Sequence, residues 1–482
     1  MNYRIIAYFI GRILRLEAVF MAPALAISLY QGEHAAAAGF LIAMGALLLV
    51  GVPWSWKRPE NRSFGAREGF VTVGLVWVVV SLFGALPFFF GGGIPSYVDA
   101  VFETVSGFTT TGASILTEVE SMAMGLLYWR SFTHWLGGMG VLVFLLAIVP
   151  MTRGSGASLH LLRAESPGPQ VGKLVPKMHQ TAKILYGIYV ALTLFQIVLL
   201  LAGGMPLFDA VTTAFGTAGT GGFAVKNDSM AGYSFYLQTV VTVFMAVFGI
   251  NFNIFYLLLI REFAKAFFNE ELRVYLGIML GSIALVTVNI SHLYPSVREA
   301  LHHAAFQVSS IMTTTGFATA DFNLWPEFSR SLLVLLMVLG ACAGSTGGGI
   351  KTARLIILFK SVRNEVWKML HPRSVKLARM DGSILDEGTL YGVNAYMAVY
   401  CIIVAVSALL VSFDNFSFET NVTAVFACLN NIGPGLGLVG PMGNYSAFSD
   451  FSKLVLTANM LIGRLEIFPI LALLMPTTWR RG

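Results

Sequence analysis

Asp99-Ala-Val-Phe-Glu-Thr-Val-Ser-Gly-Phe-Thr-Thr-Thr-Gly112 decides the fold of this chain, because related segments recur further along it. The second, Asp209-Ala-Val-Thr-Thr-Ala-Phe-Gly-Thr-Ala-Gly-Thr-Gly-Gly222, aligns without a gap, since each final glycine lies 13 positions after its aspartate. The third is Ser310-Ile-Met-Thr-Thr-Thr-Gly316, and Phe-Ala follows Gly316 as it follows Gly222. The fourth, Leu429-Asn-Asn-Ile-Gly433-Pro-Gly, is the most divergent, and Gly433 and Gly435 compete as its equivalent glycine. Recurrence of one unit indicates an internal repeat.

The glycines of these copies have a physical use in a pore. A dehydrated cation needs several oxygens close together, and backbone carbonyls supply them where the chain runs extended with its carbonyls turned inward. Glycine permits the φ values that this requires and lets four backbones approach one axis. A short helix ending at each loop would direct its negative end toward the ion. The alternative is that Gly and Thr only allow membrane helices to pack closely, and it accounts less well for four copies.

The composition places most of the chain in lipid. The sequence of 482 residues is 56% hydrophobic and 12% charged, with a mean hydropathy of +0.73, whereas a soluble domain carries roughly 25% charged residues. A membrane-spanning helix needs about 20 mostly apolar residues. Ten segments qualify: 5–29, 36–54, 71–90, 124–149, 182–202, 235–259, 274–290, 331–359, 392–411 and 454–475.

Four further apolar segments are too short to span, and each lies between two of these helices and runs into one copy of the repeat. They are 97–109, 207–218, 297–312 and 419–429. Non-helical backbone at membrane depth is tolerated only where protein buries it or where it lines a watery cavity. We therefore predict an all-α integral membrane protein with four pseudo-repeats of helix, pore helix, filter loop and helix around one pore, plus two N-terminal transmembrane helices. The predicted units are 1–66, 67–160, 161–268, 269–380 and 381–482.

The distribution of basic residues predicts the orientation. Lys and Arg cluster in the loops 57–67, 153–183, 261–273 and 360–379 and at 480–481. Ten alternating spans place all of them on the same side as the N-terminus, and positive residues mark the cytoplasm. The net charge of +6 therefore indicates topology rather than nucleic-acid binding. Asp99 and Glu103 fall on the outer side, where they either attract cations to a pore mouth or cap a helix.

The span 331–359 contains Gly340-Ala-Cys-Ala-Gly-Ser-Thr-Gly-Gly-Gly-Ile-Lys351. Each glycine inside a helix costs up to about 1 kcal/mol relative to alanine, so this stretch should break the helix of the third repeat. A break at mid-membrane belongs on the pore axis, where a mobile segment below a filter would act as a gate. A tight packing site for a neighbouring helix is the alternative.

Arg464 is the second unusual feature, because a charge in mid-bilayer costs at least a few kcal/mol and usually has a function. Glu466 lies two positions on and points to a different face, so the two need not pair. We expect Arg464 to face the cavity below the filter and repel cations there; a structural salt bridge to another helix is the alternative. His134, Asn251 and Asn253 are expected to be hydrogen-bonded structural residues, and Gly137, Gly138 and Gly140 to permit close packing.

The arrangement resembles the Trk/Ktr/HKT superfamily of K⁺ transporters, and within it the TrkH-type membrane subunits of bacterial Trk systems. The two helices before the first repeat, the total length and Asn-Asn-Ile-Gly-Pro-Gly in the fourth loop carry the resemblance, which covers essentially the whole chain. It implies one filter glycine per repeat, namely Gly112, Gly222, Gly316 and Gly433. Ion-coordinating carbonyls would come from Thr110, Thr111, Thr220, Gly221, Thr314, Thr315, Asn431 and Ile432. Glycine rather than serine at position 112 implies a preference for K⁺ over Na⁺.

The same resemblance implies a gate and partners. The gating loop would contain Gly344, Gly347, Gly348 and Gly349 and end at Lys351, and Arg464 would form part of the constriction. A TrkA-like cytosolic nucleotide-binding subunit, a homodimer with one pore per chain, and a bacterial inner-membrane location with cytoplasmic termini are further implications. The basic loops 153–183 and 360–379 are possible docking surfaces for the cytosolic subunit.

We therefore predict K⁺ uptake through a channel-like pore that is gated from the cytoplasm. The alternative is a secondary transporter with reentrant loops that moves another cation or a small solute by alternating access. Such transporters usually show inverted repeats, whereas all four units here share one order and one side. The sequence shows no paired carboxylates, nucleophile–base pair, metal-ligand spacing or nucleotide-binding glycine motif, so we expect no enzyme activity and no cofactor besides the transported K⁺.

Overall fold

The computed structural model of the chain describes residues 1–57, 59, 65–138, 140, 178–372 and 378–479. Several predicted features lie outside these residues. They are the basic positions 58, 62, 153–177, 373, 376 and 480–481, the last part of the span 124–149, and the boundary between the first two predicted repeats.

Nearly all regular structure is helical, as predicted, and a short hairpin of two strands is the exception in the part of the chain described. The helices before the third repeat are α1 (Tyr3–Tyr30), α2 (His34–Ser55), α3 (Ala66–Gly84), α4 (Leu86–Phe90), α5 (Tyr97–Phe108), α6 (Met124–Gly138), α9 (Met178–Ala202), α10 (Leu207–Gly219), α11 (Phe235–Phe248), α12 (Phe252–Leu259) and α13 (Phe263–Phe267). The later elements are α14 (Glu270–Ile290), α15 (Val297–Met312), α16 (Glu327–Val338), α17 (Thr352–Leu370), β1 (Arg379–Met380), β2 (Ser383–Ile384), α18 (Glu387–Val411), α19 (Phe418–Leu429), α20 (Asp450–Arg464), α21 (Phe468–Leu474) and α22 (Pro476–Trp479).

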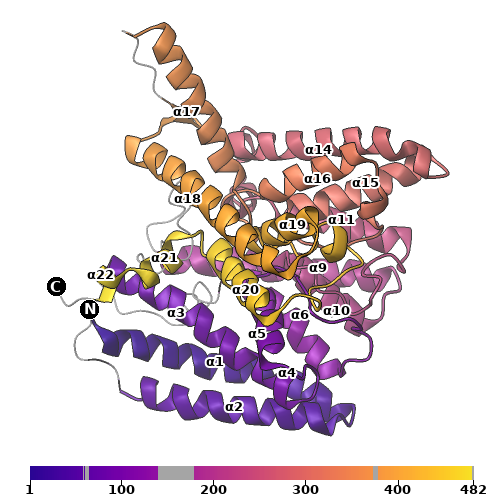
Figure 1. Cartoon of the computed structure of the whole chain (residues 1–482), viewed down its shortest axis with the longest axis vertical. Helices are drawn as coiled ribbons and strands as arrows, with labels where there is room; N and C mark the ends of the chain where they lie inside the picture. The colour runs from indigo at the N-terminus through magenta and orange to yellow at the C-terminus, as the bar shows by residue number, and fades with distance from the viewer. Residues whose placement is uncertain (58, 60–64, 139, 141–177, 373–377, 480–482) are drawn as a thin grey trace.

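The two N-terminal helices form a tightly packed antiparallel pair. Their backbones approach so closely that a Cβ added to Gly11 would lie 2.8 Å from the carbonyl oxygen of Gly51. The pair lies along the edge of the molecule that α3 and α4 line (Figure 1). Outward-facing apolar side chains on several helices, such as Leu49, Leu280 and Val288, are more than half exposed. An apolar surface of this extent suits lipid rather than water.

The four pore helices predicted from the repeat are α5, α10, α15 and α19. Three of them begin at a serine whose hydroxyl accepts a backbone N–H of the first turn, namely Ser96, Ser296 and Ser417. Such a cap satisfies donors that the first helical turn leaves unpaired. The remaining pore helix, α10 of the second unit, follows Pro206. Each pore helix stands between two other helices of its unit.

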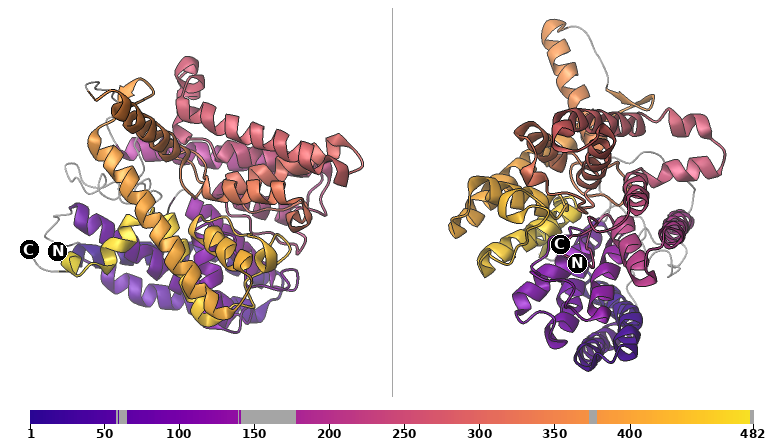
Figure 2. Two further views of the ribbon diagram at one scale, coloured as in Figure 1. Left: turned by 45° about the horizontal axis from the view of Figure 1, so that its top comes forward. Right: turned by 90° about the vertical axis from the view of Figure 1, so that its right-hand side faces the viewer.

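The four units occupy four sectors around a common centre. The right-hand view of Figure 2 shows α3–α6 in purple, α9–α12 in magenta, α14–α17 in pink to brown and α18–α21 in orange to yellow, following one another around it. The start of α1 and the end of α22 lie together at one end of the molecule, and α17 projects away from the body (Figure 1).

The predicted spans need one correction, because among the described residues the second helix is broken in the second and fourth units as well as in the third. α11 and α12 meet at 91°, a loop separates α16 from α17, and α20 is separated from α21. At the last break Glu466 and Ile467 have φ values of +55° and +72°. Six helices of the described part are long and apolar enough to cross a membrane, or seven if the bent pair is counted as one span.

Candidate functional site

The pore helices of all four units end in the same turn. Thr110, Thr220, Thr314 and Asn431 have φ values of +54°, +54°, +58° and +56°. The next residue in each unit donates its N–H to the carbonyl five positions earlier, at 2.8 Å in the first three units and 2.9 Å in the fourth. This is the geometry of a Schellman helix end, whose left-handed position is usually glycine. A β-branched residue there is strained, and recurrence of the strain points to a functional site.

A glycine with positive φ stands two positions after each of these residues. Gly112, Gly222, Gly316 and Gly433 have φ values of +77°, +75°, +89° and +93°. We refer to residues 110–112, 220–222, 314–316 and 431–433 as the four central turns. In the fourth unit Gly433 has the geometry of the other three glycines, whereas Gly435 donates its N–H to Val439, 2.7 Å away.

The central turns form a closed ring. A Cβ added to Gly112 would overlap the carbonyl oxygen of Gly221, and one on Gly222 would overlap that of Thr315. A Cβ on Gly316 would overlap the carbonyl oxygen of Ile432, and one on Gly433 would lie 2.8 Å from that of Thr111. Each glycine therefore touches the carbonyl that precedes the glycine of the next unit. No side chain fits between neighbouring turns, which explains why glycine stands at all four positions.

The carbonyl oxygens of the central turns are short of hydrogen-bond donors. Within the described part of the chain, the one at Gly433 accepts a hydrogen bond, from Tyr445, and the others accept none. Thr110, Thr220, Thr314 and Asn431 are fully buried, whereas Gly112, Gly222 and Gly316 are partly exposed. Buried carbonyls without a partner are uncommon and need an explanation. A ring of them is suited to a cation that has lost its water shell.

Side chains behind the ring hold the turns in place. The Thr111 hydroxyl lies 2.8 Å from that of Thr109 and accepts a hydrogen bond from Nδ2 of Asn431 at 2.9 Å. The His134 ring stacks on Phe223 at 4.1 Å, and its Nδ1 accepts the Phe223 N–H at 3.4 Å. His134 is thus a structural residue next to the second turn, as predicted. Gly137 and Gly138 also behave as predicted, since a Cβ on Gly138 would lie 2.6 Å from the Cα of Gly219.

Arg464 lies at the pore-helix side of the ring, where it links three units. Its Nη1 donates to the Thr110 hydroxyl at 3.0 Å and to the Thr346 carbonyl at 2.8 Å. Its Nη2 donates to the carbonyls of Gly137 and Gly138 at 2.5 and 2.8 Å. These two carbonyls end α6, so the guanidinium sits at the negative end of a helix, a favourable place for a cation.

Glu466 does not pair with Arg464, as expected from their spacing. Glu466 forms a buried ion pair with Arg354 of α17, whose guanidinium lies 4.1 Å above the Tyr396 ring. The guanidinium of Arg464 is therefore held beside the first central turn by the Thr110 hydroxyl and by three backbone carbonyls.

The glycine-rich stretch is a loop, as predicted: α16 ends at Val338 and α17 begins at Thr352. We call residues 339–351 the intramembrane loop. It lies directly against the ring, because the Gly348 N–H donates to the Thr314 hydroxyl at 2.6 Å and a Cβ on Gly348 would overlap the Asn430 carbonyl. Gly344 and Gly349 have φ values of +72° and +68°, which disfavour other residues.

The two ends of the intramembrane loop are tied together and to the second unit. The Gly340 N–H donates to the Ile350 carbonyl at 2.8 Å, and the Cys342 N–H donates to the Gly249 carbonyl at 3.0 Å. Gly344 accepts the Phe252 N–H at 3.0 Å, next to the bend where Asn251 caps α12. Lys351 is buried and donates to the Gly347 carbonyl. The loop thus closes on itself through its own basic residue.

Glu271 is a residue of this region that the sequence reading missed. It is fully buried, and its Oε1 accepts the N–H of Ala343 at 2.6 Å and of Ala353 at 3.0 Å. One carboxylate thus holds the loop at both of its sides. A sequence signal existed, since Glu271 sits beside Glu270 at a helix start that Asn269 caps, but nothing local indicated that it turns inward.

The outer acids do not match the predicted cation-attracting mouth. Glu103 is buried and forms an ion pair with Arg130 at 2.6 Å, and it also accepts the Ile115 N–H at 2.9 Å. The expectation for Glu103 was wrong in both forms, because neither a mouth acid nor a solvated cap would be buried. Asp99 lies in the first turn of α5 and pairs with Lys453 at 2.6 Å, which joins the first and fourth units.

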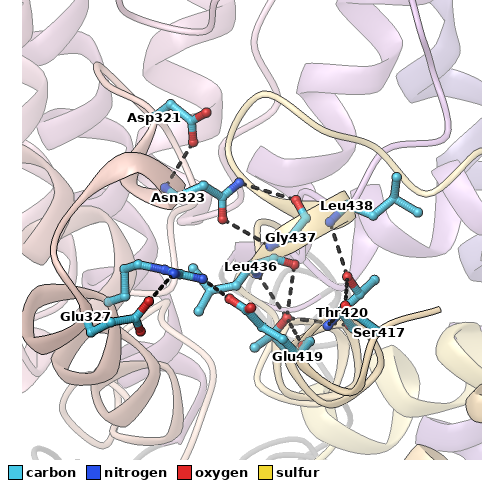
Figure 3. Close-up of polar contacts among 11 residues, drawn as sticks. Asp321, Asn323, Glu327, Ser417, Glu419, Thr420, Leu436, Gly437 and Leu438 are labelled. Carbon is cyan, nitrogen blue, oxygen red and sulfur yellow. Dashed lines mark hydrogen bonds and ion pairs between the residues drawn. The ribbon is translucent and has the colours of Figure 1, made fainter.

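Hydrogen bonds and ion pairs of the loops beyond the central turns join neighbouring units to one another. Figure 3 shows the contact between the third and fourth units, where the side chain of Asn323 both donates to and accepts from the backbone of Gly437, at 3.3 and 3.0 Å. Arg330 links Glu327 on its own helix with Glu419 of α19. Between the first two units, the Val119 N–H donates to Asn227 at 2.8 Å. These contacts fix the separation of the units on which the ring depends.

Comparison with known proteins gives one consistent answer. The family model described as TrkH, a cation transport protein, matches residues 36–478. The Trk system potassium uptake protein TrkH of Salmonella typhimurium is 36% identical over 488 residues, with 100% of both chains covered. TrkG of Escherichia coli is 30% identical over 484 residues, covering 99% of each. The crystal structure of the potassium transporter TrkH from Vibrio parahaemolyticus matches with a TM-score of 0.88 and 32% identity over 100% of both chains.

Proposed function

Because this chain belongs to the TrkH family of cation transport proteins, we propose that it carries K⁺ across the bacterial inner membrane as the membrane subunit of a Trk-type uptake system. Its full-length relatives are potassium uptake proteins, and its helices include several long enough to span a bilayer. Nothing in the relatives favours the alternative of a secondary transporter for another solute. We propose transport without a chemical step.

The selectivity filter in this proposal is the ring of central turns. Its ligands are carbonyl oxygens of Thr110, Thr111, Gly112, Thr220, Gly221, Gly222, Thr314, Thr315, Gly316, Asn431, Ile432 and Gly433. The observation that carries the proposal is that, in the described part of the chain, the carbonyls of the central turns other than that of Gly433 accept no hydrogen bond, although the turns are packed into a closed ring. K⁺ would supply the missing partner, since carbonyl oxygens can replace its water shell.

The gate in this proposal consists of Arg464 and the intramembrane loop with Gly344, Gly347, Gly348, Gly349 and Lys351. The guanidinium of Arg464 bonds the first central turn and the loop at once, so moving either one releases the other. A cation at this place raises the energy of K⁺ leaving the ring. Conduction therefore requires the loop and Arg464 to withdraw together.

The family relationship implies cytosolic regulatory components, and we propose a TrkA-like nucleotide-binding subunit as that partner. The sequence contains no nucleotide-binding glycine motif of its own. α17 joins the intramembrane loop directly and projects from the body, with Met369 and Leu370 largely exposed (Figure 1). A partner that moved α17 would pull on the gate. We further propose that the chain forms a homodimer and that both termini are cytoplasmic.

The test is uptake of K⁺ and Na⁺ tracers into liposomes that hold the purified chain, with and without a membrane potential. We expect K⁺ to enter faster than Na⁺ and to follow the potential. Uptake that favoured Na⁺, or that required an opposing solute gradient, would reject the proposed pore.

A further inference from the structure

The fourth central turn differs from the others in one hydrogen bond. The Tyr445 hydroxyl donates to the carbonyl oxygen of Gly433 at 2.7 Å. A carbonyl oxygen has two lone pairs, so Gly433 keeps one for an ion while the other is engaged. In the part of the chain described, no carbonyl of the other three turns has such a donor.

The other turns have supports that the fourth lacks. In the first and third, the middle residue is a threonine whose hydroxyl lies 2.8 Å from the hydroxyl two positions earlier, on Thr109 and Thr313. In the second, the N–H that follows the glycine donates to His134. The corresponding positions of the fourth turn are Ile432, whose side chain has no polar group, and Pro434, which has no N–H. Tyr445 supplies the missing support from outside the turn.

Tyr445 is itself held rigidly. It is 2% exposed, and its ring centroid lies 5.5 Å from that of Phe102 and 5.8 Å from that of Phe448. Its N–H donates to the carbonyl of Ser114 at 2.8 Å, two residues beyond Gly112. Tyr445 therefore joins the first and fourth units: its backbone N–H bonds the carbonyl of Ser114, just beyond the first turn, and its hydroxyl bonds the carbonyl of Gly433 in the fourth turn.

We propose that Tyr445 is a positioning residue that sets the preference for K⁺ over Na⁺ by fixing the Gly433 carbonyl. The proposal rests on the filter proposed above. A carbonyl tied to a rigid phenol cannot move inward to contact a smaller ion, so the fourth turn stays at the distance that suits K⁺. Asn431 anchors the start of this turn, but without the hydroxyl neither Ile432 nor Pro434 supplies a donor that keeps the Gly433 carbonyl from moving toward Na⁺.

The test compares Tyr445→Phe with the full-length wild-type chain in proteoliposomes, measuring K⁺ and Na⁺ tracer uptake in the same vesicles. The substitution keeps the ring packing and removes the hydroxyl. We expect the K⁺ to Na⁺ uptake ratio to fall roughly two- to tenfold, the range of one neutral hydrogen bond. Tyr233→Phe is the matched control. It also removes a tyrosine hydroxyl, but one that donates to Asp209 at 2.8 Å and does not contact a central turn. This substitution should leave the ratio unchanged.

The ratio does not depend on how much protein is reconstituted, so partial loss of folded Tyr445→Phe protein leaves the test intact. An unchanged ratio, or an equal fall in the Tyr233→Phe control, would overturn the proposal about Tyr445. A fall in both fluxes with a constant ratio would show a merely structural role and would also overturn it. Failure of the wild-type chain to prefer K⁺ would instead reject the filter itself.

Discussion

The central turns and the helices that follow them differ in how closely the four units resemble one another. All four turns share a left-handed first residue, a glycine with positive φ and the same backbone bond to the pore helix. The second helices share little: α6 runs without a break to Gly138, α11 and α12 bend by 91°, a loop divides α16 from α17, and two residues of positive φ follow α20. A ring that surrounds one ion, as proposed above, needs equal ligands from its four units, whereas the second helices are under no such requirement.

The largest expected effect comes from Gly112→Ser, which makes one central turn different from the other three. The added Cβ would overlap the Gly221 carbonyl and strain a φ of +77°. We expect the K⁺ to Na⁺ uptake ratio to fall by about tenfold or more, as displaced ligands no longer match K⁺. Gly277→Ser is the control, since nothing lies within 4 Å of a Cβ there. A wild-type ratio in Gly112→Ser would contradict the filter assignment.

Arg464→Ala tests the second helices, in which the four units differ. It removes a cation and four hydrogen bonds at the pore-helix side of the ring. We expect K⁺ flux to rise by about tenfold, since a charge in this environment represents at least 1–2 kcal/mol, while the K⁺ to Na⁺ ratio stays constant. Tracer uptake normalised to reconstituted protein measures it, and Arg363→Ala provides a comparison at a site far along α17. A lower flux would reject the barrier role.

Deletion of Gly347–Gly349 shortens the intramembrane loop without touching the ring glycines. It removes the donor to Thr314 and the carbonyl that binds Lys351. We expect a several-fold change in K⁺ flux and an unaltered K⁺ to Na⁺ ratio, because each lost bond contributes roughly 0.5–1.5 kcal/mol. Should the ratio change while the flux did not, the loop would belong to the filter instead.

Glu271→Ala tests how firmly the loop is held closed. It leaves the N–H groups of Ala343 and Ala353 without an acceptor, which costs about 1–3 kcal/mol and loosens the closed loop. We predict a two- to tenfold higher basal K⁺ leak in vesicles without any partner. Glu270→Ala, which removes a partly exposed ion pair with Lys360, should leave the leak as it is. Equal leak in both variants would show that Glu271 does not restrain the gate.

The sequence predicted the central turns better than the helices that follow them. The four pore helices, the ring glycines and the break after Val338 were predictable, because each is encoded by a local run of residues. The bend at Asn251, the turn at Glu466 and the inward position of Glu271 were not, since each depends on a partner far away in the chain. Glu103 shows the limit most clearly: its burial depends on Arg130, 27 positions on, and an acidic residue in an outer segment looks solvated until that partner is placed.

The single arginine below the ring has a consequence for the architecture of the whole chain. In a channel assembled from four identical subunits, any residue placed there would occur four times, and four guanidinium groups would meet at one point and repel one another. Joining the copies in one polypeptide removes that constraint, because one copy can carry the charge while its siblings supply the acceptors. The barrier proposed for Arg464, with one guanidinium contributed by one unit, is therefore possible in a chain of four unequal units and impossible in an assembly of four identical subunits.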